Sequence, residues 1–464
     1  MGITDSIKSE VMAQILKNVH NISNENLIRL VSLAGKLTKD ESAKSAVNGL
    51  KKYFEEGHIS LEFAKDLIKR LSPNCRDKMI RNLLINSQLK GNERRNKFQE
   101  ENGFRPPFLV VVSPSMRCNL RCKGCYAGEY TQKDDLSTEM LEKIFIEIRE
   151  MGINFVVISG GEPYIRQDLF DLFKKYDDMY FLTYTNGTLI TKEVAKKLAE
   201  LGNVAPAISV EGFKEETDER RGEGVYDKVL QAMDNLKEAG VMFGFSATPT
   251  KTNADLLTTD KFIDFYTEKG CSFGWLFQYI PIGLKPCVEL MATPEQRTAL
   301  RHKVHNEWRD NKKIFIGDFW NDGCYVTGCM AGGRKYLHIT CKGDIEPCVF
   351  THFTSDNIHD TTIREALNSE LFKKIREGQR TVNNLLTPCC IIDNPEILRK
   401  AVKESGAKPS HPGAETIVED PKIREHLDNY AKRMKELADE DWNNAERYKS
   451  HREGWEKTKE KEQY

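Results

Sequence analysis

The run Cys118-Asn119-Leu120-Arg121-Cys122-Lys123-Gly124-Cys125 places three cysteines within one short loop. A [4Fe–4S] cluster is normally held by four cysteine thiolates. A CxxxCxxC loop supplies three, which leaves one iron open to a substrate or cofactor. The alternative is a structural zinc knuckle, but such a site is closed and needs a fourth ligand nearby. No cysteine or histidine follows Cys125 closely, so the loop predicts an iron–sulfur cluster with an open iron.

Length and composition narrow the class of protein. A chain of 464 residues predicts two or three structural units. Lys plus Arg total 69 and Asp plus Glu total 70, so no charged field points to nucleic acid, and we expect no nucleic-acid partner. No apolar run is long enough to cross a bilayer, and the N-terminus lacks a signal-peptide pattern. We therefore expect a cytoplasmic protein, in which the twelve cysteines favour metal ligation over disulfides.

The first hundred residues read as a series of short amphipathic helices. Two apolar faces carry this prediction: Val11, Ile15, Leu16 and Val19, then Leu27, Leu30, Val31 and Ala34. These faces favour a helical cap packed on the next unit. The alternative is a docking surface for a partner or peripheral contact with a lipid surface.

From residue 108 the pattern changes to alternating strands and helices. The predicted strands are 108–112, 155–159, 180–185, 205–210, 242–247 and 273–279. Helical stretches at 138–151, 167–176, 192–201, 226–239 and 259–269 lie between them. Strands joined by crossover helices predict an α/β fold with a parallel sheet covered on its outer face. The cysteine loop follows the first strand, at the C-terminal end where such barrels carry their chemistry.

Three more motifs end the next three predicted strands. They are Ser159-Gly160-Gly161-Glu162-Pro163, Thr185-Asn186-Gly187 and Ser209-Val210-Glu211-Gly212. Together with the cysteine loop they resemble the radical S-adenosylmethionine (SAM) superfamily over residues 105–290. The resemblance implies a partial (β/α)6 TIM-like barrel. It also implies that Cys118, Cys122 and Cys125 hold a [4Fe–4S] cluster whose open iron binds the amino and carboxylate groups of SAM.

The same resemblance implies further contacts with SAM. Gly160 and Gly161 would let the backbone approach the ligand without a Cβ clash, and Glu162, followed by Pro163, would meet the SAM ammonium. The other contacts implied are Asn186 beside the carboxylate, Ser209 or Glu211 on the ribose, and Arg221 on the carboxylate. For Asn186 the alternative is ordinary Asn-Gly turn chemistry, and for Arg221 it is a surface salt bridge.

The chain departs from the family pattern just before the third loop cysteine. Family members usually carry an aromatic residue there, near adenine, whereas this chain has Gly124. Adenine packing would then fall to Tyr126, or to Ile280 and Pro281.

A second cysteine group begins at Cys329, and its spacing to Gly343 and Cys348 resembles the SPASM or "twitch" extension that houses auxiliary clusters. Residues 336–340 and 348–350 read as a hairpin turning at Lys342-Gly343-Asp344, which would bring Cys329 and Cys348 together. Cys389 or Cys390 would supply a third thiolate. The candidates for the fourth ligand are Cys324, Cys341, His352 or a substrate atom. The full SPASM pattern contains a CxxCxxxxxC run, and this chain has none. We therefore expect one auxiliary [4Fe–4S] cluster rather than two; the alternative is a set of buried free thiols.

These observations predict four regions: a helical N-terminal region (1–100), the barrel (105–293), a cysteine-rich extension (294–395) that opens with a linking helix at 294–311, and a charged tail (396–464). We expect residues 421–464 to form a solvated helix or to be partly disordered.

The resemblance implies reductive cleavage of SAM to a 5′-deoxyadenosyl radical, which abstracts hydrogen from a substrate. A low-potential reductant such as flavodoxin or ferredoxin is implied as partner. The sequence leaves open whether the substrate is a peptide, or a lipid or other small molecule that undergoes C–H functionalisation, including C–C coupling. The alternative outside catalysis is an electron-transfer or structural iron–sulfur protein.

Overall fold

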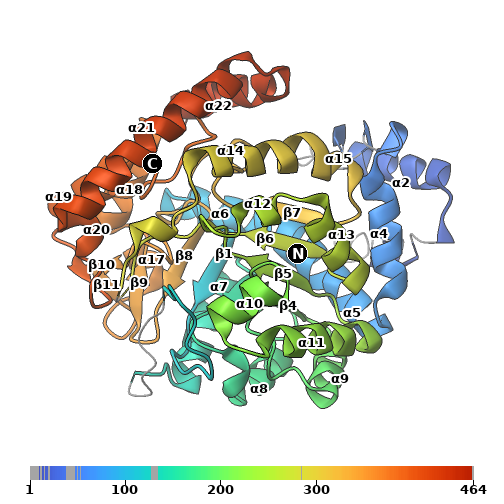
Figure 1. Ribbon diagram of the computed structural model, residues 1–464. Coiled ribbons are helices and arrows are strands. Elements are labelled where there is room, and N and C mark those ends of the chain that lie inside the picture. Colours follow the sequence, from blue (N-terminus) through green and yellow to red (C-terminus); the bar gives the residue numbers. More distant parts are fainter. Residues whose placement is uncertain are drawn as a thin grey trace.

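Six parallel strands form the centre of a ten-stranded sheet (Figure 1). They are β1 (Leu109–Val112), β2 (Phe155–Ile158), β3 (Tyr180–Thr185), β4 (Val204–Val210), β5 (Gly244–Ala247) and β6 (Phe273–Leu276), paired in chain order. Each overlaps a predicted strand, and the parallel α/β architecture is confirmed. The computed structural model describes residues 10, 13–14, 16–18, 21–37, 48–49, 51–52, 54–126, 134–283 and 285–461.

Amphipathic helices cover the outer face of this sheet. They are α7 (Thr138–Glu150), α8 (Asp168–Lys175), α9 (Lys192–Leu201), α11 (Val225–Ala239) and α13 (Asp260–Lys269), and all five were predicted. Helix α7 shows why they form: Leu141, Ile144 and Ile148 recur at helical spacing and are buried, and the Ser137 side chain caps the first turn. The short helices α10 (Lys214–Arg221) and α12 (Ala254–Leu257) were not predicted.

The extension adds strands to both edges of the same sheet. Strand β7 (Phe315–Asp318) pairs with β6, and β8 (Tyr336–Ile339) pairs with β1, both in parallel. The antiparallel strands β9 (Asp344–Glu346) and β11 (Asp356–Asn357) extend the β8 edge, and β10 (Phe353–Thr354) pairs with β12 (Lys408–Pro409). The predicted hairpin turn at Gly343 is present, but its second strand is residues 344–346 rather than 348–350. Pro347 has no N–H to continue the ladder, so Cys348 lies in the turn that follows.

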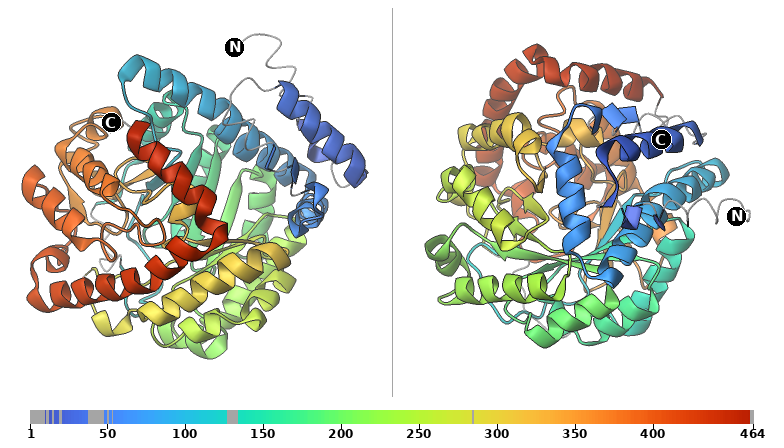
Figure 2. Two further views of the ribbon diagram at one scale, coloured as in Figure 1. Left: turned by 90° about the horizontal axis from the view of Figure 1, so that it is seen from above. Right: turned by 90° about the vertical axis from the view of Figure 1, so that its right-hand side faces the viewer.

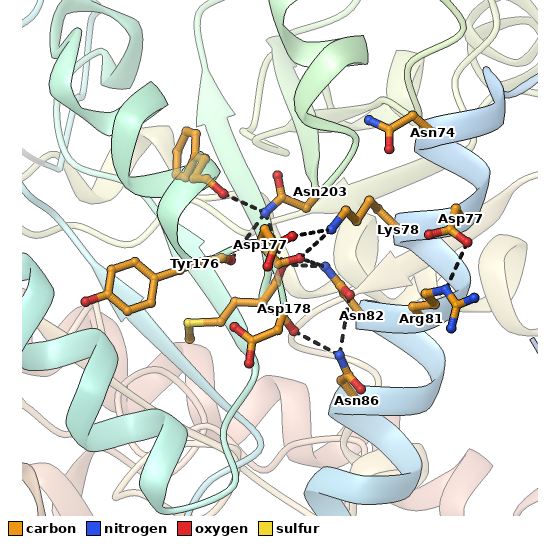
Figure 3. Close-up of polar contacts among 12 residues, drawn as sticks. Asn74, Asp77, Lys78, Arg81, Asn82, Asn86, Tyr176, Asp177, Asp178 and Asn203 are labelled. Atoms are coloured by element: carbon orange, nitrogen blue, oxygen red, sulfur yellow. Dashed lines mark hydrogen bonds and ion pairs between the residues drawn. The ribbon is translucent and has the colours of Figure 1, made fainter. Parts of the chain in front are cut away.

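The N-terminal helices close the amino end of the sheet. They are α2 (Asn24–Leu37), α4 (Ile59–Arg70), α5 (Pro73–Lys78), the π-helix η2 (Met79–Lys90) and α6 (Gly91–Asn102). Asn82 of η2 donates to the carbonyl oxygens of Asp177 and Met179 at 2.7 and 2.9 Å, directly before β3. Figure 3 shows Asn82 pointing from its helix toward the segment that carries Asp177. Arg95 donates to the carbonyl of Gly152, before β2, at 2.9 Å.

These contacts favour the packed-cap interpretation of the N-terminal region. The lipid-contact alternative stays a prediction. Val11, Ile15 and Val19 of the first predicted face lie outside the described residues.

The predicted linking helix is confirmed as α14 (Pro294–Lys303), continued by η5 (Val304–Trp308) and α15 (Arg309–Asn311). Beyond it the extension and tail contain α16 (Gly323–Val326), α17 (Ile363–Ala366), α18 (Glu370–Arg380), α19 (Pro395–Ser405) and α20 (Thr416–Glu419). Short 3₁₀ turns occur at η3 (Pro163–Ile165), η4 (Val288–Leu290) and η6 (Glu446–Tyr448).

The charged tail is a packed structure, which corrects the prediction of a solvated or partly disordered helix. Helix α21 (Pro421–Asn444) lies along α14, and α22 (Lys449–Lys461) follows it (Figure 2). One face of α21 buries Leu427, Tyr430 and Met434. The dense charges of the opposite face hide this spacing in the sequence. Among the described residues, no helix is both long and apolar enough to cross a membrane.

Candidate functional site

The cysteine loop leaves the C-terminal end of β1, and N–H donors lie near two of its three thiols. The N–H of Leu120 donates to Cys118 Sγ at 3.4 Å, and Asn186 Nδ2 lies 3.9 Å from the same sulfur. Arg221 Nη1 lies 3.9 Å from Cys122 Sγ. Burial raises the pKa of the Cys118 and Cys122 thiols, and at Cys122 the guanidinium of Arg221 opposes this effect. Donors of this kind stabilise thiolates and tune an iron–sulfur cluster, so the donor set fits the predicted three-thiolate site.

Gly160 and Gly161 lie directly against the cysteine loop. The N–H of Gly161 donates to the carbonyl of Ser115 at 2.9 Å, and the N–H of Glu162 donates to the carbonyl of Arg117 at 2.8 Å. A Cβ at Gly161 would lie 2.1 Å from Arg117 O, and a Cβ at Gly160 would lie 2.5 Å from Ser115 O. The close approach that these glycines allow is therefore to the chain's own loop, while their contact with SAM stays a prediction.

Glu162 is buried at the end of β2 and is held by the end of β3. Its carboxylate accepts hydrogen bonds from Thr185 Oγ1 at 2.7 Å, from the N–H of Asn186 at 2.8 Å and from the N–H of Tyr164 at 3.2 Å. Burial raises the pKa of Glu162 to about 7, although these donors oppose the shift. A carboxylate has roughly four acceptor positions, so capacity for one more donor, such as an ammonium, remains. Pro163 opens the short turn η3 behind it and is buried.

Asn186 and Ser209 occupy different places around the sheet end. Asn186 donates from Nδ2 to Asn119 Oδ1 at 2.8 Å, which ties the end of β3 to the cysteine loop. Ser209 lies on β4 opposite Ser246 of β5, with 3.5 Å between the two hydroxyl oxygens. The structure thus brings Asn186 to the loop, whereas Ser209 lies on β4, two strands from β2.

Glu211 binds two arginines, and this arrangement was not predicted. Its carboxylate accepts from Arg221 Nε at 2.9 Å and Nη2 at 2.5 Å, and from Arg220 Nη1 at 2.6 Å. Arg220 Nε also donates to the carbonyl of Lys123 within the cysteine loop at 3.2 Å. Arg221 is therefore held beside Cys122 by a buried carboxylate rather than in a surface salt bridge. Both Glu211 oxygens are engaged, so Glu211 is better suited to positioning Arg221 than to binding ribose.

Tyr126 follows the third loop cysteine and faces the second cysteine group. Its hydroxyl is 2.8 Å from Ser159 Oγ, and its ring centroid is 5.8 Å from that of Phe350. Burial raises the pKa of Tyr126 to about 12. Beside Gly124 lies Tyr279, whose Cε2 is 3.0 Å from the position that a Cβ would take. Tyr279 follows β6, the last of the six central strands, and brings an aromatic ring to the loop. The sequence pointed instead to its neighbours Ile280 and Pro281.

The second group brings four thiols to one cavity. Cys329, Cys348, Cys389 and Cys390 all line it, together with apolar and aromatic side chains. Tyr336 Oη donates to Cys348 Sγ at 2.7 Å, and the N–H of Ile391 donates to Cys389 Sγ at 3.4 Å. A hydrogen bond from Cys390 lowers the pKa of the Cys329 thiol to about 7. Four thiols that line one cavity match, in number and type, the ligand set of a [4Fe–4S] cluster.

The fourth thiol in this cavity is Cys390. The three side chains that the sequence offered as the fourth cluster ligand, Cys324, Cys341 and His352, do not line the cavity. Cys324 packs with Leu385 and Trp442 beneath the tail helices. Cys341 packs against Met116 beside the first cysteine loop. His352 stacks on His411, with 4.2 Å between ring centroids. Sequence reasoning considered Cys390 only as a substitute for Cys389, because spacing alone cannot show that two adjacent cysteines face one cavity.

Aromatic rings lie between the two cysteine groups. Phe350 contacts Tyr126 on one side and Trp320 on the other, with ring centroids 5.8 and 5.0 Å apart. Trp320 lines the cavity of the second group. A substrate between the two groups would therefore meet an aromatic wall.

A buried polar cluster, also not predicted, anchors the base of the first loop. His338 of β8 contacts Ser113 Oγ through Nε2 at 2.7 Å and Glu346 Oε2 of β9 through Nδ1 at 2.6 Å. Ser113 directly follows β1, so the extension strands fix the start of the cysteine loop.

Comparisons with known proteins agree with this geometry. The model of the radical SAM superfamily matches residues 112–263, and that of an iron–sulfur cluster-binding domain, SPASM, matches residues 329–393. The mycofactocin maturase MftC of Mycolicibacterium smegmatis is 30% identical over 303 residues, which cover 61% of this chain and 75% of that protein. The Fe-coproporphyrin III synthase of Methanosarcina barkeri is 36% identical over 165 residues, which cover 33% of this chain and only 41% of that protein.

Among solved structures, Streptococcus suis SuiB bound to the precursor peptide SuiA has a TM-score of 0.53 at 19% identity, covering 71% of this chain and 84% of that chain. This likeness supports the TIM-like partial barrel. The chain belongs to the radical SAM superfamily of enzymes, which bind SAM at a [4Fe–4S] cluster and need a reductant, and it carries an iron–sulfur extension of the SPASM type.

Proposed function

We propose that this chain cleaves SAM at a [4Fe–4S] cluster held by Cys118, Cys122 and Cys125, and that it abstracts a hydrogen atom from a substrate bound between the two cysteine groups. The observation that carries this proposal is the three-cysteine loop at the C-terminal end of β1, with Arg221 3.9 Å from Cys122 Sγ. When bound, the cluster and SAM supply the 5′-deoxyadenosyl radical.

The chain's own residues would orient SAM. Glu162 has acceptor capacity for its ammonium, and the guanidinium of Arg221, fixed by Glu211, is available to its carboxylate. Asn186 is held against the cysteine loop and would lie beside the same carboxylate. Ser209 would contact the ribose. Tyr126 and Tyr279 are the two candidates for packing on adenine.

The second cysteine group would hold one auxiliary [4Fe–4S] cluster through Cys329, Cys348, Cys389 and Cys390. In this proposal the N-terminal region ends near residue 100, the barrel spans 105–293, the extension spans 294–395 and the tail spans 396–464.

A low-potential donor, flavodoxin or ferredoxin, would reduce the first cluster. All twelve cysteines lie within the described residues and are free thiols, which supports a reducing, cytoplasmic location.

The substrate would present an unactivated C–H group to the aromatic wall of Tyr126, Phe350 and Trp320. The two relatives described above are named for unlike products, so family membership does not choose among substrates. A peptide, and a lipid or other small molecule that undergoes C–H functionalisation or C–C coupling, are the classes to compare. Comparing the peptides, lipids and metabolites of a deletion strain with those of its parent would separate them.

The direct test is anaerobic reconstitution with iron and sulfide, followed by addition of SAM and dithionite. We expect 5′-deoxyadenosine and methionine to form in equal amounts. A protein that binds a cluster yet forms no 5′-deoxyadenosine would contradict the proposal.

A further inference from the structure

Two adjacent residues, Cys389 and Cys390, both line the cavity of the second cysteine group. Successive side chains of an extended segment point to opposite sides, so neighbours can reach one cluster only from a turn whose backbone is fixed. The carbonyl of Cys389 accepts from the N–H groups of Asp393 at 3.2 Å and Asn394 at 2.9 Å. The N–H of Cys389 donates to Asp393 Oδ2 at 3.0 Å. Asp393 therefore holds the turn through its backbone N–H and through its carboxylate.

Asp393 is itself held by Arg297 of the linking helix α14. The guanidinium binds both carboxylate oxygens, from Nη1 at 2.5 Å and from Nη2 at 3.1 Å, and both side chains are 0% exposed. Arg297 also donates from Nε to Asn321 Oδ1 at 3.0 Å and from Nη2 to the carbonyl of Trp320 at 3.3 Å. Trp320 lines the same cavity. One guanidinium thus fixes two walls of the cavity.

The cost of burial argues that this ion pair has a purpose other than stability. Removing two charges from water is expensive, and well-packed apolar residues often replace a buried pair without loss of stability. A planar guanidinium, in contrast, offers several donors in a fixed geometry that a flexible side chain does not provide. This property suits a group that must hold a carboxylate and a backbone carbonyl in fixed relation.

We propose that Arg297 is a positioning residue of the auxiliary cluster: through Asp393 it holds the turn that directs the thiols of Cys389 and Cys390 to the same cluster. This inference rests on the proposed function, because it requires these cysteines to be cluster ligands.

The chain offers a matched control for testing Arg297. Arg301 lies one turn later on α14, is also 0% exposed, and pairs with Asp441 of the tail helix at 2.6 Å. Arg297→Met and Arg301→Met each remove one buried guanidinium and one ion pair, but only the first frees the Cys389–Cys390 turn. Both full-length proteins are reconstituted anaerobically and reduced with dithionite. Their cluster signals are then recorded by electron paramagnetic resonance, with and without SAM, because SAM changes the signal of the cluster that binds it and so separates the two.

We expect Arg297→Met to lose at least half of the auxiliary signal and Arg301→Met to keep it. Equal losses in both variants would mean a general effect of removing a buried cation. A parent-like signal in Arg297→Met would mean that the Cys389–Cys390 turn keeps its conformation without Arg297. Either result overturns the inference.

If Arg297→Met does not fold, Arg297→Lys retains the buried charge but cannot hold Asp393 and Asn321 together. We expect the midpoint potential of the auxiliary cluster to shift in Arg297→Lys, and an unchanged potential overturns the inference. Parent enzyme that gives no 5′-deoxyadenosine, or no auxiliary signal, contradicts the proposed function itself. Parent enzyme that gives both, with parent-like Arg297 variants, contradicts only the role of Arg297.

Discussion

Gly161→Ala should damage the first cluster site by displacing the cysteine loop, although the substitution adds one methyl group and touches no cluster ligand. The new Cβ would lie 2.1 Å from Arg117 O, 2.6 Å from Arg117 C and 2.8 Å from Met116 C. All three neighbours are backbone atoms, so no side chain can rotate away. Ordinary contact begins at 3.4 Å, so the loop must move by about 1.3 Å just before Cys118. The backbone at Gly161 lies outside the left-handed region, which makes the effect purely steric.

The energetic cost follows from the same contacts. Overpacking of this kind costs about 1–3 kcal/mol. Displacement of the loop also weakens the two backbone hydrogen bonds to Ser115 and Arg117, at about 1 kcal/mol each. We expect a total free-energy cost of about 3–5 kcal/mol, which lowers the stability of the fold and in part displaces the loop.

The assay is iron and sulfide content after anaerobic reconstitution, together with 5′-deoxyadenosine formation and thermal unfolding. The first cluster should be lost while the auxiliary cluster remains, and SAM cleavage should fall at least tenfold. Gly454→Ala is the matched control, because a Cβ there meets nothing within 4 Å; it should keep the parent's iron content and cleavage rate and unfold no earlier, since alanine favours the helix α22 in which it lies. A Gly161→Ala protein with the parent's iron content, unfolding temperature and cleavage rate would refute the steric argument.

Three further predictions concern the two clusters and pH. Alanine variants of each of the three loop cysteines should lose SAM cleavage, as measured by 5′-deoxyadenosine. Cys390→Ala should lower the iron content of the auxiliary site whereas Cys324→Ala should not; equal iron in both variants would remove Cys390 from the ligand set. Burial raises the pKa of Glu162 from 4.5 to about 7. Between pH 4.5 and pH 7 the folded apoprotein therefore keeps a proton that the unfolded chain has lost. Its free energy of unfolding should fall as the pH rises through this range. Glu162→Gln should flatten this fall in urea unfolding curves at pH 5 and pH 7.5, and an unchanged slope would count against the shift.

The sequence predicted the central fold because its signals are local. Strands β1 to β6 are apolar runs of four to seven residues, and their covering helices repeat apolar residues at helical spacing. Helix α10 was missed because its sequence, Lys214 to Arg221, is almost wholly charged. The second hairpin strand was misplaced because the apolar run after Pro347 looks like a strand, although the proline ends the ladder.

The sequence predicted those parts of the candidate site that lie in motifs directly after a strand. Motifs that directly follow β1, β2 and β3 gather at one edge because the strands are parallel. The partners that complete them come from other elements: Tyr279 follows β6 and His338 lies on β8. Contacts of this kind depend on the three-dimensional path of the chain, and no periodicity or spacing in one sequence reports them.

The extension is part of the same sheet as the strand that carries the three-cysteine loop. Strands β7 and β8 pair with β6 and β1, the two edges of the six-stranded centre. Unpaired edges expose rows of N–H and C=O groups, so the extension satisfies edges that the barrel alone would leave open. The same strands carry chemistry: β8 holds His338 against the base of the cysteine loop, and the cavity of the second cysteine group lies next to residues that follow β7. Both cysteine groups are therefore anchored to the backbone of a single sheet, the first through Ser113 and His338 and the second through the residues that follow β7.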